Sequence, residues 1–229
     1  MMNVTEELER LRIVPVVVIR DPLRATLMAR ALVDGGLPCA EITFRTPGAP
    51  EALRRIAADN PNMLVGAGTV LNPGQAAQAR DAGARFIVSP GFNPRVVDYC
   101  QEHDIPVYPG VCTPSEIQSA LEKGLEVLKF FPAEPMGGPR FLKAISAPFP
   151  GLRFIPTGGI GVEHLPGYLE LGEVVVACGG SWIAPAGWIN AGSFDRIRAE
   201  AERAVAVARG ERPENQAPGA ATTPAMWNK

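Results

Sequence analysis

Signals for metal and nucleic-acid binding are nearly absent from this chain of 229 residues. The only two histidines, His103 and His164, are isolated, and neither belongs to a cluster with metal-ligand spacing. Lysine is also scarce, and the formal net charge of −2 gives no support for a nucleic-acid partner. We therefore expect neither a metal site nor a nucleic-acid interface.

Cysteines are few and long apolar runs are missing, which bears on the compartment. The four cysteines, Cys39, Cys100, Cys112 and Cys178, form no C-x-x-C pair, and three of them lie in or beside apolar runs. This pattern predicts buried free thiols in a reducing compartment. No apolar run approaches the ~20 residues that span a bilayer, and residues 1–12 do not resemble a signal peptide. We expect a cytoplasmic protein with no membrane partner.

What the sequence does contain is a repeated alternation of apolar runs and helical patterns. The runs, each of which predicts a strand, lie near residues 13–19, 39–44, 63–67, 85–88, 105–109, 125–131, 152–156 and 173–178. Eight strand–helix units of roughly 20–27 residues fit the connections of a parallel sheet and predict an α/β fold, a single (β/α)8 TIM barrel. The alternative is an open doubly wound sheet, although its G-x-G-x-x-G marker is incomplete, with leucine at the third glycine position in Gly66–Leu71.

Both ends of the chain depart from the repeat. Residues 3–11 predict a short helix before the first strand. After Gly210 the chain is rich in Pro, Ala and Thr without periodicity, which is typical of a flexible tail. We expect one barrel domain at 1–210 and a disordered tail at 211–229, from which Trp227 could dock on the body.

The residue that bears most on function is Lys129. It lies in the middle of an apolar stretch bounded by Gly124 and Pro132 that predicts a short buried strand. Burial favours the neutral amine, which is a nucleophile that can form a Schiff base with a ketone. The alternative is a lysine whose stem packs while its charged head reaches water.

The second predicted strand carries polar side chains at every other position. Glu41, Thr43 and Arg45 share one face, while the apolar alternate set suits packing against helices. The polar face then points into the barrel, where Glu41 could act as a general acid/base and Arg45 could bind a carboxylate. The alternative is a structural ion pair between Glu41 and Arg45.

The same alternation turns Lys129 inward, so Glu41, Arg45 and Lys129 are expected to meet in one cavity. Thr69 ends the third strand and would add a hydroxyl donor, unless it is only a turn residue. Two glycine-rich turns follow the last two strands, at 156–160 and 178–182. Loops at these positions often hold phosphate in barrel enzymes, although a glycine pair can also be a simple tight turn. The phosphate ligands predicted from these turns are Thr157, Gly158, Gly159, Gly180 and Ser181.

Taken together, these segments resemble a known family, the 2-keto-3-deoxy-6-phosphogluconate aldolases, also described as 4-hydroxy-2-oxoglutarate aldolases. The matching blocks occur in order between about residues 13 and 208, at 41–46, 66–70, 89–91, 129–133, 156–160 and 179–182. The resemblance implies a metal-free class I aldolase of the Entner–Doudoroff pathway on a TIM barrel, usually a homotrimer, without a cofactor. Its substrate would be a phosphorylated keto acid, cleaved to pyruvate and glyceraldehyde 3-phosphate.

Carried over by position, the resemblance also implies residue roles. Lys129 resembles the Schiff-base lysine and Glu41 the proton-shuttling carboxylate. Arg45 and Thr69 resemble the residues that hold the pyruvate carboxylate. The implied active-site wall residues are Pro90 and Phe131. Two alternatives remain: a relative that acts on 4-hydroxy-2-oxoglutarate, which has no phosphate, and a non-catalytic barrel that binds phosphosugars.

Overall fold

The structure, a computed structural model, describes residues 3–211. The tail predicted at 211–229, apart from Glu211, lies outside the described residues, and so does the predicted docking of Trp227. The division into a domain at 1–210 and a tail therefore stays a prediction. Within the described residues, no helix is both long and apolar enough to cross a membrane.

Within residues 3–211, nine short strands follow the predicted apolar runs, and every strand pair is parallel. They are β1 (Ile13–Val17), β2 (Cys39–Thr43), β3 (Leu64–Gly68), β4 (Ile87–Val88), β5 (Val107–Tyr108), β6 (Gly110–Val111), β7 (Val127–Phe130), β8 (Arg153–Pro156) and β9 (Cys178–Gly180). One sheet has six strands in the order β5-β4-β3-β2-β1-β9, and the other has three in the order β6-β7-β8. The predicted α/β fold with a parallel sheet is confirmed.

Helices occupy the connections between strands. The α-helices are α1 (Val4–Leu11), α2 (Ala25–Asp34), α3 (Ala49–Asp59), α4 (Pro73–Asp81), α5 (Pro94–Glu102), α6 (Pro114–Glu122), α7 (Gly138–Ser146), α8 (Leu165–Leu169), α9 (Ala186–Ala191) and α10 (Phe194–Ala208). Short 3-10 turns precede α2 (Pro22–Arg24), α8 (Val162–His164) and β9 (Gly172–Val174). Several helices begin at proline directly after a capping Asn or Thr, because proline has no N–H to leave unpaired in the first turn.

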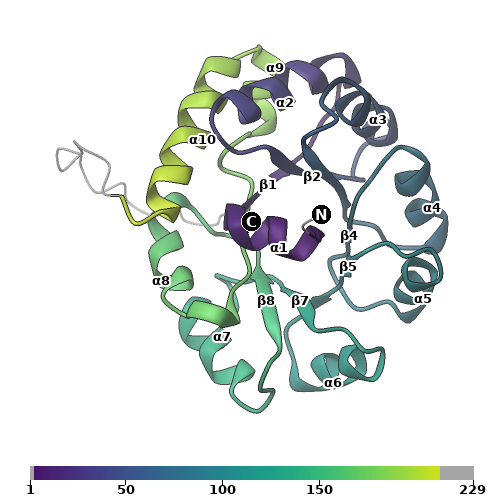
Figure 1. The fold of residues 1–229 in the computed structure, drawn as a ribbon, viewed down its shortest axis with the longest axis vertical. Coiled ribbons are helices and arrows are strands. Elements are labelled where there is room, and N and C mark those ends of the chain that lie inside the picture. Colours follow the sequence, from purple (N-terminus) through teal and green to yellow (C-terminus); the bar gives the residue numbers. More distant parts are fainter. Residues whose placement is uncertain (1–2, 212–229) are drawn as a thin grey trace, which may run out of the picture.

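The strands lie around the middle of the molecule and the helices form its outer layer (Figure 1). The helix α1, predicted at residues 3–11, lies across the middle of the view and is capped by Asn3. Strands β1, β2 and β3 are buried along their whole length, as expected for parallel strands covered on both faces. The two parallel sheets thus form the inner layer of the molecule, covered by helices on the outside (Figure 1).

Two strands differ from the sequence prediction. The run at 105–109 contains only β5, and a further short strand, β6, follows just beyond it; Pro109, which has no N–H to donate to a ladder, lies between the two. The eighth strand was predicted at 173–178 but β9 begins at Cys178. The 3-10 turn Gly172–Val174 occupies the start of the predicted run, and the Cys178 N–H donates to the Arg12 carbonyl at the start of β1.

Candidate active site

A buried lysine and a buried glutamate lie side by side at the centre of the fold. Strand β7 carries Lys129 and β2 carries Glu41, which are 4% and 3% exposed. The Lys129 Nζ atom lies 3.7 Å from the Glu41 Oε1 atom. The lysine head therefore does not reach solvent, and the structure brings together the two residues that strand alternation predicted to meet.

The carboxylate of Glu41 keeps an acceptor atom free. Among the described residues, Oε1 has no hydrogen-bond partner. A buried oxygen without a partner is costly and is most often retained where it serves a function. Gly68, at the end of β3, leaves the space for this group, since a Cβ atom there would lie 1.9 Å from Oε1.

Arg45 and Thr69 form a second pair at the carboxyl ends of their strands. The Arg45 Nε donates to the Thr69 Oγ1 at 3.1 Å. Both residues lie beyond the strands, in the turns after β2 and β3, and Arg45 is exposed. Thr69 has a φ of 56°, in the left-handed region that threonine rarely adopts. No ion pair joins Glu41 to Arg45 within residues 3–211, so the purely structural alternative for them is not found.

A cavity of about 420 Å³ adjoins these groups at the ends of β1, β2, β7, β8 and β9. It is lined by Val16, Arg45, Phe131, Thr157, Gly158, Gly159, Ile160, Gly179, Gly180, Ser181 and Trp182. The ring of Phe131 connects it to the buried pair, because the Lys129 Nζ lies 5.0 Å from the ring centroid. The predicted carboxylate-binding arginine and all five predicted phosphate ligands thus line one cavity.

Glycine is required in the walls of this cavity. Gly158 and Gly159 have φ values of 105° and 81°, which favour a residue without Cβ. At Gly180 a Cβ atom would lie 1.5 Å from the ring of Trp182. A Cβ atom at Gly159 would likewise lie 2.8 Å from the Glu134 Cβ, so side chains at Gly159 and Gly180 would collide with their neighbours. Thr157 also lines the cavity, but its hydroxyl lies within hydrogen-bond distance of the Ile155 carbonyl, at 3.4 Å.

The predicted wall residue Pro90 does not line this cavity. It lies against Gly110, where a Cβ atom would be 2.2 Å from the Pro90 carbonyl oxygen. Gly110 is the register partner of Lys129, so Pro90 is close to the lysine strand. Trp182 and Val16 also line the cavity, although no site role was predicted for them from the sequence. The proximity of Trp182 to the glycine pair was the one signal for it.

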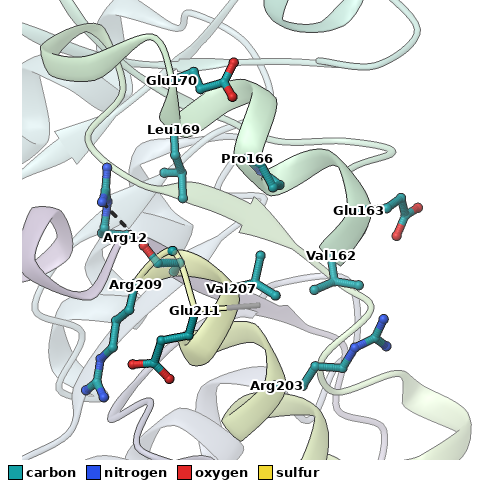
Figure 2. A pocket seen from close by; sticks show the side chains of 12 residues that line it. Arg12, Val162, Glu163, Pro166, Leu169, Glu170, Arg203, Val207, Arg209 and Glu211 are labelled. Carbon is teal, nitrogen blue, oxygen red and sulfur yellow. Dashed lines mark hydrogen bonds between the residues drawn. The ribbon is translucent and has the colours of Figure 1, made fainter. Parts of the chain in front are cut away.

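A larger cavity, of about 620 Å³, contains none of the predicted site residues. It lies between α8 and the end of α10, with Leu169 and Val207 on its apolar wall (Figure 2). Arginine and glutamate side chains of both signs surround it, so it lacks a uniform charge that would select an ionic ligand. Among the residues that the structure describes, no three His, Cys, Asp or Glu side chains gather as a metal site.

Comparison with known proteins identifies the family. The model of the family described as "Aldolase: KDPG and KHG aldolase" matches residues 4–200. The chain belongs to this family. It is 46% identical over 207 residues to the 2-dehydro-3-deoxy-phosphogluconate aldolase of Treponema pallidum, covering 90% of this chain and 98% of that protein. The resemblance predicted from the sequence motifs is confirmed, and membership of an aldolase family makes the chain a carbon–carbon lyase.

Two solved aldolase structures share the fold. The KDPG aldolase of Legionella pneumophila, with pyruvate captured as a covalent carbinolamine, has a TM-score of 0.83 and 39% identity, covering 86% of this chain and 96% of that one. The enzyme of Zymomonas mobilis, solved with 3-phosphoglycerate, has a TM-score of 0.82 and 40% identity, covering 90% and 97%. Family membership therefore extends to the arrangement of the elements that carry the site.

Proposed function

We propose that this chain is a class I aldolase that cleaves 2-keto-3-deoxy-6-phosphogluconate to pyruvate and glyceraldehyde 3-phosphate. The observation that carries the proposal is the buried pair of Lys129 and Glu41, with Nζ and Oε1 3.7 Å apart, beside the glycine-lined cavity. A lysine nucleophile with an adjacent carboxylate suits Schiff-base chemistry. The covalent pyruvate adduct of the Legionella relative supports the same chemistry here.

The proposed reaction begins at the amine of Lys129. Neutral Nζ attacks the C2 ketone to give a carbinolamine, and Glu41 supplies the proton with which water leaves, so that an iminium ion forms. The C3–C4 bond then breaks, its electron pair enters the iminium system as an enamine, and Glu41 takes the C4 hydroxyl proton directly or through a water. Glyceraldehyde 3-phosphate departs. Protonation of the enamine at C3 and hydrolysis of the iminium release pyruvate and restore the lysine.

Arg45 and Thr69 are proposed to hold the carboxylate of the substrate next to this pair. Their side chains are already joined at 3.1 Å, so guanidinium and hydroxyl are oriented together before substrate arrives. A guanidinium suits planar carboxylates, and its attraction to them strengthens where water is excluded. Phe131 and Pro90 are the proposed walls around the Lys129 amine.

The phosphate is proposed to bind at the glycine turns after β8 and β9. Thr157, Gly158, Gly159, Gly180 and Ser181 are the proposed ligands, and all five line the cavity that also contains Arg45. Backbone N–H groups in glycine-rich turns are suited to phosphate oxygens. The structure of the Zymomonas relative with 3-phosphoglycerate supports a phosphorylated substrate.

Cleavage assays with two substrates test this proposal. We expect the protein to release pyruvate and glyceraldehyde 3-phosphate from the phosphorylated keto acid, with a kcat/KM higher than for 4-hydroxy-2-oxoglutarate. Faster cleavage of the unphosphorylated substrate would favour the alternative substrate class. For an enzyme with this mechanism, Lys129→Ala should abolish turnover but spare ligand binding. The non-catalytic alternative would be supported if the wild type binds the phosphorylated keto acid and releases no pyruvate from it.

The finer architecture is also a proposal. The two sheets are proposed to close into one eight-stranded TIM barrel, in which β5 and β6 are halves of one strand. Single bridges from Phe154 to Val175 and from Thr157 to Gly179 support a contact between β8 and β9. The family resemblance supports a cytoplasmic homotrimer without a cofactor. Light scattering after size-exclusion chromatography tests the trimer, since it separates one from three copies of 24.4 kDa.

A further inference from the structure

The turn proposed to bind phosphate is joined to the segment that follows the lysine strand. The Ala133 N–H donates to the Thr157 carbonyl at 2.8 Å, and the Glu134 N–H donates to the Gly158 carbonyl at 3.0 Å. These bonds continue the pairing of β7 with β8 beyond both strands. The position of Gly158 therefore depends on the segment that ends at Glu134.

The side chain of Glu134 connects this segment to α8. One carboxylate oxygen accepts a hydrogen bond from the Tyr168 hydroxyl at 2.5 Å, and the other lies 3.7 Å from the His164 Nε2. His164 in turn accepts the Gly161 N–H at its Nδ1, at 2.9 Å. Both ends of the turn from Gly158 to Gly161 are thus linked to Glu134, one through the backbone and the other through His164.

Glu134 also supports the turn by direct packing. A Cβ atom at Gly159 would lie 2.8 Å from the Glu134 Cβ, so this glycine rests on the glutamate. Tyr168 is fully buried. Its burial, and to a lesser extent the nearby Glu134, raise the pKa of its phenol, so the hydroxyl stays protonated and can donate a hydrogen bond. Neither Glu134 nor Tyr168 lines the 420 Å³ cavity. Any effect they have on substrate must therefore pass through the turn.

We infer that Glu134, held by the Tyr168 hydroxyl, is a positioning residue that holds the Gly158–Gly159 turn in the shape that accepts phosphate. It thereby sets the preference for phosphorylated over unphosphorylated substrate. A hydroxyl-to-carboxylate hydrogen bond is among the stronger ones in proteins, so its loss is expected to loosen the turn. This inference rests on the proposed function, because it assumes that the turn binds the substrate phosphate.

The test compares two tyrosine-to-phenylalanine variants that each remove one buried hydroxyl. Tyr168→Phe removes the bond to Glu134. Tyr108→Phe removes a 2.9 Å bond to Thr5 of α1 and is the matched control, because Tyr108 is also buried and lines neither the turn nor the cavity. The readout is the ratio of kcat/KM for the phosphorylated keto acid to that for 4-hydroxy-2-oxoglutarate, together with inhibition by inorganic phosphate.

We expect Tyr168→Phe to lower this ratio about tenfold, through a higher KM for the phosphorylated substrate, and to weaken inhibition by phosphate. Tyr108→Phe should leave the ratio at the wild-type value. Glu134→Gln, which keeps an acceptor for the hydroxyl, should retain more of the ratio than Glu134→Ala. If the wild type prefers the phosphorylated substrate and Tyr168→Phe shows the same ratio, the role of Glu134 is overturned while the proposed function stands. A wild type that does not cleave that substrate would overturn the proposed function as well.

Discussion

At the scale of single residues, the site retains features that oppose folding stability. Lys129 and Glu41 are buried, and Thr69 has a left-handed backbone conformation. For a residue with a Cβ this conformation costs roughly 1–2 kcal/mol relative to glycine. Such costs persist where the surrounding structure holds them in place, and they are common at functional sites.

Thr69 offers a direct test of this cost. Thr69→Ala and Thr69→Gly both remove the hydroxyl that contacts Arg45. We expect the glycine variant to be the more stable of the two by ~1 kcal/mol, because only glycine adopts a φ of 56° without steric penalty. Urea unfolding measures the difference, and both variants should show a higher KM. An alanine variant as stable as the glycine variant would contradict a strained Thr69.

Glu41 is expected to transfer protons both when the covalent adduct forms and when the C3–C4 bond breaks. Glu41→Gln keeps the volume and removes the charge, so kcat should fall by ~10²–10⁴-fold, the usual contribution of a positioned acid/base. Steady-state assays measure this loss. Glu126→Gln, at an exposed position just before β7, is the matched control and should retain activity. Equal activity in the two variants would remove Glu41 from the proposed mechanism.

Single residues were predictable from sequence where strand alternation decides their direction. Glu41 and Lys129 meet because both face inward, one from β2 in the six-stranded sheet and the other from β7 in the three-stranded sheet, and alternation is a local property of the chain. Pro90 and Trp182 depend on loop geometry instead. Pro90 lies against Gly110 and Trp182 covers Gly180, and neither contact follows from spacing in the sequence.

At the scale of elements, local sequence signals decide where several helices begin. Asn72, Asn93 and Thr113 each cap a helix that begins at the proline directly after them, and such Asn-Pro and Thr-Pro pairs can be recognised in the sequence. The late start of β9, at Cys178, could not be predicted from the sequence. The apolar run 173–178 continues through a 3-10 turn, and only pairing with β1 determines which part of it becomes a strand. Apolar character alone does not separate these two conformations.

The cap of α6 gives a pH-dependent prediction. Burial acts to raise the pKa of Glu116, but hydrogen bonds from the Cys112 N–H and from the Thr113 hydroxyl and N–H outweigh it and lower the pKa. Because the pKa of Glu116 is lower in the folded protein, its negative charge stabilises the fold at pH values above the pKa of the unfolded chain, which is 4.5 for this carboxyl. This stabilisation is lost as the pH falls through the lower pKa of the folded state.

Glu116→Gln should therefore lower the free energy of unfolding by roughly 0.5–1 kcal/mol at pH 7, allowing for solvent screening of this half-buried group. The difference from wild type should shrink below pH 4.5. Urea unfolding at pH 7 and at pH 3.5 measures both values. A difference that stays the same or grows at the lower pH would contradict the proposed role of the charge.

At the scale of the whole molecule, the core determines which thiols can react. All four cysteines are free, and Cys39, Cys100 and Cys178 are buried, as predicted. Burial raises the pKa of Cys100 to about 11 and that of Cys178 to about 12, and it holds the pKa of Cys39 well above its usual range. Cys112 is the half-buried exception, although burial and the nearby Glu116 also raise its pKa.

We expect one thiol of the folded protein, Cys112, to react with a disulfide reagent at pH 8, since reaction requires access as well as the thiolate. The other three should react only after unfolding in guanidinium. Cys112→Ser should remove the single early reaction. Rapid reaction of several thiols in the folded protein would contradict the buried core described above.

The central claim, that Lys129 is the Schiff-base residue, is tested most directly by reducing the protein with borohydride in the presence of pyruvate and mapping the modified peptide by mass. Lys123 and Lys143 lie at the end of α6 and in α7 and serve as internal controls. The account predicts a single adduct, confined to Lys129 and missing from Lys129→Ala. No adduct, or an adduct on Lys123 or Lys143 instead, would contradict it.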